Sequence, residues 1–157
     1  MSQCTEQFLA EVVRVDLIPA ALCTFPIPFG VSELTQMSGC TLGQPSLTLD
    51  VTEGAGTALL TDTPQIKTTP HSQTAGHMRT HELQLSVRGS HEDLQSACAS
   101  LADTYFHCVL TQAGGARYLL YALPGTSVVT VDDTLTNELR MTVKVSLQSM
   151  SHMILLP

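Results

Sequence analysis

Charged residues are scarce in this sequence, and basic residues are the scarcest of them. Only 13% of the 157 residues are charged, about half of the usual quarter, and seven basic residues leave a net charge of −7. The basic residues stand singly at Arg14, Lys67, Arg79, Arg88, Arg117, Arg140 and Lys144. Nucleic-acid binding needs clustered cations that neutralise phosphates. The sequence therefore predicts no direct contact with DNA or RNA.

The sequence also lacks a segment suited to crossing a membrane. The mostly apolar stretch Pro19–Phe29 is short and is interrupted by Pro26 and Pro28, so it cannot span a bilayer. Residues Met1–Glu6 are polar and do not resemble the basic start of a signal peptide. The cysteines are Cys4, Cys23, Cys40, Cys98 and Cys108. Their odd number and the absence of a CxxC pair predict free thiols in a cytoplasmic protein. Because no segment is suited to spanning a bilayer, we also predict no membrane partner.

Catalytic and cofactor-binding motifs are missing as well. The patterns GxSxG, HExxH, GxGxxG and Walker A do not occur. Asp132 and Asp133 are interpreted as turn residues rather than as a carboxylate pair. His107 and Cys108 are neighbours on a predicted strand, where they point to opposite faces and cannot act on one substrate atom. We predict no catalytic or cofactor-binding residues, and we expect that the protein is not an enzyme.

Histidine is a metal-ligating residue type that occurs six times in the sequence. The histidines are His71, His77, His81, His91, His107 and His152. His77 and His81 have the HxxxH spacing that chelates a metal on a helix. Their segment reads as a strand, however, where they stand roughly 13 Å apart. We therefore predict no metal site and interpret the histidines as surface or loop residues.

The sequence is rich in segments where apolar and polar residues alternate, which is typical of strands with one buried face. The clearest is the last, in which the apolar positions are Leu139, Met141, Val143, Val145 and Leu147. Strands are predicted at 8–18, 46–51, 57–61, 78–88, 105–111, 117–122, 126–131 and 138–148. One helix is predicted near 91–103, capped by Ser90 with Asp93 and buried through Leu94, Cys98 and Leu101.

These elements predict a mainly β, α+β fold in a single domain covering residues 1–157. Because one helix cannot cover both faces of a large sheet, we expect an antiparallel β-barrel or a two-sheet sandwich, with the helix at an end or flank. Three prolines make the segment 19–30 a turn-rich connection rather than a central strand. The polar segment 63–76 is predicted to be an exposed loop or hairpin tip, with contact to a partner as the functional alternative.

One part of the chain carries a resemblance to a known class of proteins. The block THELQLSV, a short helix, YFHCVLT, QAGGARYLLYALPG and the final alternating strand lie within Met78–Met150. This order resembles small structural proteins of prophages and phage-tail-like particles from gut bacteria, most closely in the hairpin Gly115–Leu120. The resemblance implies a tail or connector component that oligomerises, and it carries over no catalytic residue.

The leading hypothesis is a non-enzymatic assembly protein, a phage-derived virion or tail component that oligomerises and contacts other structural subunits. The aromatic residues Tyr105, Phe106, Tyr118 and Tyr121 fit a core or a self-association surface. The alternative is a small-ligand-binding β-barrel with a mouth formed by Pro26–Phe29 and Thr63–Gly76. A third class, an enzyme whose site is assembled from distant residues, stays open.

Overall fold

The structure, a computed structural model of the whole chain, describes most of the 157 residues. The described residues are 12–26, 36–62, 64–73, 76–102, 105–132, 140–150 and 153–156. The strands are β1 (Val12–Pro19), β2 (Leu47–Asp50), β3 (Ala58–Leu60), β4 (Gln65–Gln73), β5 (Gly76–Arg88), β6 (Phe106–Gln112), β7 (Arg117–Leu120), β8 (Val128–Asp132), β9 (Arg140–Ser149) and β10 (Ile154–Leu156). The helices are the short 3-10 helix η1 (Ala20–Leu22) and the α-helix α2 (His91–Ala102). The predicted mainly β, α+β class is therefore confirmed.

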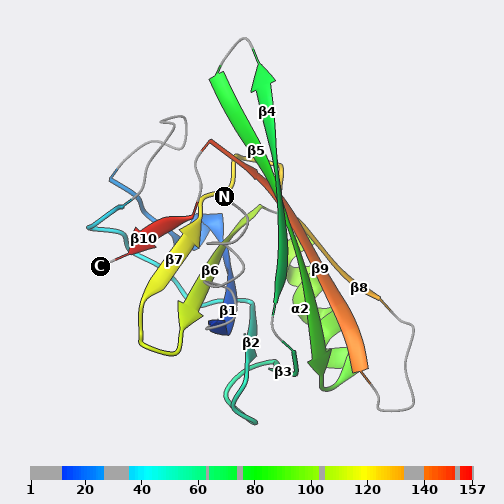
Figure 1. Cartoon of the computed structure of the whole chain (residues 1–157). Helices are drawn as coiled ribbons and strands as arrows, with labels where there is room; N and C mark the ends of the chain where they lie inside the picture. The colour runs from blue at the N-terminus through cyan, green and yellow to red at the C-terminus, as the bar shows by residue number, and fades with distance from the viewer. Residues whose placement is uncertain are drawn as a thin grey trace.

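All the described strands belong to one mixed sheet (Figure 1). Its order is β10-β7-β6-β1-β2-β3-β5-β9-β8, and β4 pairs with β5 beside that path. Neighbouring strands are antiparallel except for β2 and β3, which are parallel. The sheet is not closed within the described residues, so the predicted barrel is wrong. It is closer to the sandwich alternative, because two parts of one sheet face a common core.

That main core lies between the two parts of the sheet and α2. β5 contributes Leu83, Leu85 and Val87, and the alternating apolar residues of β9 pack against them. From the other part of the sheet, β1, β2 and β6 bury residues such as Phe106, which is fully inaccessible. The helix adds a buried stripe at its predicted positions, Leu94, Cys98 and Leu101, and Ala97 beside them is buried as well. Its predicted cap is confirmed, since the Asp93 N–H donates to Ser90 Oγ at 3.3 Å.

A second, smaller core lies on the opposite face of β1, β6 and β7. Ile18, Val109, Leu119 and Tyr121 form it together with β10 and Met37. Residues 23–26 and 36–42, here called the covering segments, pack over it through Cys23, Phe25, Cys40 and Leu42. The strand β6 is thus buried on both faces, which explains why its sequence is apolar without strict alternation.

The segments 63–76 and 19–30 can be compared with the structures predicted for them from the sequence. Residues 63–76, predicted as an exposed loop or hairpin tip, consist mostly of strand β4, which forms a hairpin with β5; a long loop is therefore wrong. The proline in β4, Pro70, is compatible with strand structure because β4 is an edge strand. In the connection 19–30, the described residues form the end of β1, the 3-10 helix η1 and an isolated bridge at Thr24, while residues 27–30 lie outside the described residues.

Gly43 marks a close approach between the last residue of η1, Leu22, and the segment that precedes β2. A Cβ atom at this position would clash with Leu22 Cβ and would lie 2.8 Å from the Leu22 carbonyl oxygen. We expect Gly43→Ala to lower the free energy of unfolding by about 1–3 kcal/mol, because the backbone must move apart. Urea denaturation measures this effect. Gly114→Ala, where an added Cβ meets nothing within 4 Å, is the control, and equal losses in both variants would contradict the expectation.

Candidate functional site

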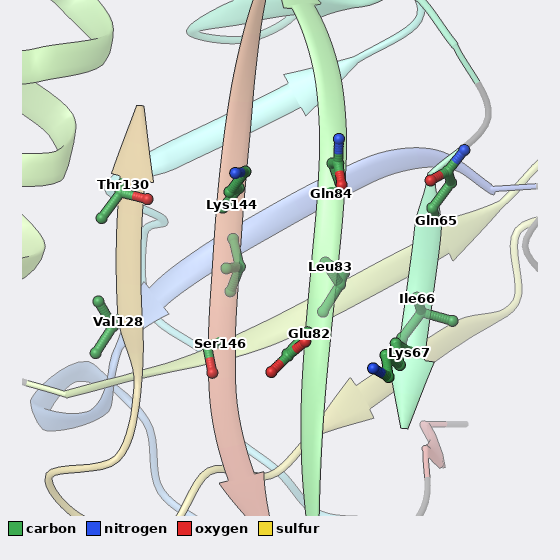
Figure 2. Close-up of a pocket in the computed structure, with 11 residues that line it drawn as sticks. Gln65, Ile66, Lys67, Glu82, Leu83, Gln84, Val128, Thr130, Lys144 and Ser146 are labelled. Atoms are coloured by element: carbon green, nitrogen blue, oxygen red, sulfur yellow. The ribbon is translucent and has the colours of Figure 1, made fainter. Parts of the chain in front are cut away.

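The outer face of β4, β5, β9 and β8 is slightly hollowed and carries mostly polar side chains with a few apolar ones (Figure 2). In one row across the strands, Lys67 stands opposite Glu82, which stands opposite Ser146. In the next row Gln84 lies between Gln65 and Lys144. These side chains line an open hollow of about 510 Å³. It is a mixed surface on which amides, hydroxyls and single charges stand beside apolar side chains such as the exposed Val128, and it is suited to contact with a partner protein.

The residues that line the hollow include no histidine or cysteine. Its acidic and hydroxyl groups, Glu82 and Ser146, are surface neighbours, and Lys67 lies opposite Glu82. The hollow includes Gln65, Ile66 and Lys67 of the predicted ligand site at Thr63–Gly76, whereas residues 27–29 of the other predicted segment lie outside the described residues. It is open and lies on the outside of the sheet, whereas the expected barrel mouth needed a closed sheet.

The histidines do not form the surface population that the sequence suggested. His81 and His107 are buried, with 1% and 2% of their surface exposed, so the surface interpretation is wrong for both. His91 is exposed at the start of α2. His71 and His77 belong to β4 and β5, and His152 lies outside the described residues. Among the described residues no three His, Cys, Asp or Glu side chains come together as a metal site would require.

His107 is enclosed by aromatic rings from distant parts of the chain. Its ring centroid lies 5.0 Å from that of Phe25, 5.6 Å from Tyr105 and 5.1 Å from Tyr121, each in an edge-to-face arrangement. The Ala122 N–H donates to His107 Nδ1 at 3.0 Å, which leaves the proton of the neutral ring on Nε2. Burial lowers the pKa of His107 to about 4. The ring is therefore neutral at pH 7 and serves as a packed acceptor.

The other buried histidine, His81, faces the main core from β5. Its Nδ1 lies 3.0 Å from Thr68 Oγ1 on β4. The alternation of β5 puts His81 in the same series as the buried Leu83 and Leu85. That period-two pattern was the sequence signal that could have identified its burial.

The cysteines of the main core and the acidic pair do not form a reactive site among the described residues. Cys108 points into the main core while His107 belongs to the second, so the predicted opposite orientation is confirmed. Burial raises the pKa of the Cys108 thiol far above its ordinary value, and it also raises that of Cys98. Both thiols are poor nucleophiles at neutral pH. Asp132 is exposed at the end of β8, and Asp133 lies outside the described residues.

An ionic network that the sequence analysis did not identify joins β1 to β2. Arg14 Nε donates to both oxygens of Asp16 at 3.1 and 3.2 Å, and Arg14 Nη1 lies 3.4 Å from Asp50 Oδ2. Thr48 Oγ1 donates to Asp16 Oδ1 at 2.7 Å. The hydrogen bond to Asp16 is the main cause that raises the pKa of Arg14. Since its groups satisfy one another, the network stabilises the strand pair rather than offering a reactive group.

The comparisons with other proteins add no identity. No family model matches the chain, and neither a curated protein nor a solved structure is significantly similar to it. Among the described residues no helix is long and apolar enough to cross a membrane.

Proposed function

We propose that this chain is a non-enzymatic assembly protein that oligomerises through the outer edge of β4. The observation that carries the proposal is the open edge of β4. The end strand β10 is bridged by Gln36, with the Met37 N–H donating to the Leu155 carbonyl at 3.0 Å, and the end strand β8 pairs with β9 and contacts α2. Among the described residues the sheet pairing of β4 is with β5 alone, so its other edge offers unpaired backbone groups to another strand.

The shape of the β4–β5 hairpin supports the same proposal. β9 pairs with β5 only as far as Arg79, opposite Ser149. Beyond that pair the hairpin continues as two strands, to Gln73 opposite Gly76, and projects from the body of the protein (Figure 1). A two-stranded ribbon is marginally stable by itself in water. Docking against a neighbouring subunit would bury this ribbon and stabilise it.

Pro70 defines where a partner strand would pair. Proline has no N–H to donate to β5, so its place opposite Arg79 fits a nitrogen that faces the open edge. Backbone groups alternate in direction along a strand, which turns the N–H and C=O groups of Ile66 and Thr68 toward the same edge. The available ladder is therefore interrupted at Pro70, which has no N–H to donate. This limits uncontrolled growth while permitting a specific contact between subunits.

Within this proposal the chain is a phage-derived virion or tail component that also contacts other structural subunits. The likeness of Met78–Met150 to prophage and phage-tail-like structural proteins supports that finer identity, and a cytoplasmic location before particle assembly is part of the same proposal. The seven scattered basic residues support a contact with protein rather than with nucleic acid.

Adding positive charges at the open edge of β4 tests the proposal. Gln65→Lys with Thr69→Lys adds two positive charges beside Lys67 on the outer face of β4. Repulsion across a pairing edge is expected to raise the dissociation constant of the oligomer about tenfold or more. Light scattering over a concentration series measures the molar mass.

The matched control adds the same two charges on the neighbouring strand β5. Gln84 and Thr80 on β5 are the cross-strand partners of Gln65 and Thr69, so Gln84→Lys with Thr80→Lys changes the charge equally and leaves the edge of β4 unaltered. We expect this control to keep the oligomer of the wild type. A wild type that stays monomeric at high concentration, or equal weakening by both double variants, would overturn the proposal.

A further inference from the structure

Two half-buried thiols lie on the same side of a single bridge between the covering segments. Thr24 and Thr41 form an antiparallel bridge, with the Thr24 N–H donating to the Thr41 carbonyl at 2.8 Å and the Thr41 N–H donating back at 2.9 Å. Cys23 precedes one threonine and Cys40 precedes the other. In an antiparallel pair these positions share a face and are diagonal neighbours.

The packing of the covering segments agrees with that placement. Cys23 and Cys40 both pack against the second core, together with Phe25 and Leu42, the residues that stand across the bridge from them. Cys98 and Cys108, in contrast, are buried in or beside the main core. Cys23 and Cys40 are thus, among the described cysteines, the pair that combines a common face with partial exposure.

From this geometry we propose that Cys23 and Cys40 form a reversible disulfide that fastens the two covering segments together. Diagonal neighbours stand about 7–8 Å apart at Cα, slightly beyond the range of a disulfide, so the segments must approach by about 1–2 Å. The bridge consists of one residue pair, and Gly39, beside Cys40, has a positive φ of 78°. A short bridge flanked by glycine permits that movement.

The reaction is a thiol–disulfide exchange with a small disulfide such as glutathione disulfide. The Cys40 thiolate attacks one sulfur of that disulfide, forms a mixed disulfide and releases the first glutathione thiolate. The Cys23 thiolate then attacks Cys40 Sγ, forms the protein disulfide and releases the second. The protein loses two electrons and two thiol protons, and glutathione disulfide gains the electrons and becomes two thiols.

Access and acidity determine which thiol reacts first and how fast. Cys40 lines a small surface hollow with Gly39 and Arg117. Burial raises the pKa of both the Cys40 and the Cys23 thiols, and Arg117 offsets only part of the rise at Cys40. Oxidation is therefore expected to be slow at pH 7 and clearly faster at pH 8.5, where more thiolate is present.

The test oxidises the folded full-length chain with glutathione disulfide and maps the products under non-reducing conditions by mass spectrometry. We expect a peptide that joins Cys23 to Cys40, reversal by dithiothreitol, and a Tm higher by about 5–10 °C in the oxidised protein. Cys23→Ser should stop at a glutathione adduct on Cys40. Cys98→Ser, the matched control at a buried thiol, should form the cross-link as the wild type does.

Other outcomes would overturn the inference. They are a wild type in which Cys40 carries glutathione without bonding to Cys23, a cross-link that involves Cys4 instead, or a reaction that needs denaturant. The inference is independent of the proposed assembly function. The molar mass of the reduced protein tests that function, and failure of the cross-link would leave it unchanged.

Discussion

Lowering the pH from 7 to 4 is expected to remove about 3 kcal/mol of folding stability through His107 alone. In the folded protein the pKa of His107 is about 4, against an ordinary value of 6.5. In the unfolded chain the His107 ring therefore takes up a proton below pH 6.5, while in the folded chain the same ring stays neutral until about pH 4. Between these values the unfolded state binds more protons, so stability falls as the pH falls. The difference between the two pKa values corresponds to the stated energy.

Urea denaturation of the wild type and of His107→Gln at a series of pH values measures this contribution. Glutamine retains an acceptor for the Ala122 N–H and does not titrate, so the stability advantage of the wild type over this variant should shrink by about 3 kcal/mol between pH 7 and pH 4. His91→Gln is the control, because His91 is exposed. An advantage that stays constant with pH would show that His107 is not the group responsible.

Much of the sheet could be predicted because its main signal is local. The alternation in β9 identified Met141, Val143, Val145 and Leu147, and all four are buried. β4 was missed because an edge strand needs no apolar face on its own sequence: its residues are mostly polar, and its structure comes from pairing with β5. The parallel pairing of β2 with β3 was also unpredictable, since no local pattern encodes which strands become neighbours.

The candidate sites were harder to predict than the strands. The rings around His107 come from Phe25, Tyr105 and Tyr121, which only the tertiary fold brings together. The thiols of Cys23 and Cys40 likewise depend on the bridge between the covering segments. In each case the residue type was visible in the sequence, and the missing information was a contact between distant segments.

The second large effect is expected at Phe106, the fully buried aromatic residue at the start of β6. Phe106→Ala should lower the free energy of unfolding by about 3–5 kcal/mol, because the lost ring contacts and the remaining cavity both cost stability. Thermal and urea denaturation measure the loss. Val128→Ala, at a site that is 55% exposed, should stay within about 0.5 kcal/mol of the wild type.

Variants at Phe106 also test whether a loss of stability by itself causes dissociation of the oligomer, because β6 and β4 are not neighbours in the sheet. If Phe106→Ala leaves too little folded protein, Phe106→Leu keeps much of the apolar volume and should lose less stability. In the folded fraction, the leucine variant should retain the molar mass of the wild type, whereas the lysine pair on β4 should lower the mass. A Phe106→Leu protein that folds and yet dissociates would move the subunit contact away from β4 and toward the body of the sheet.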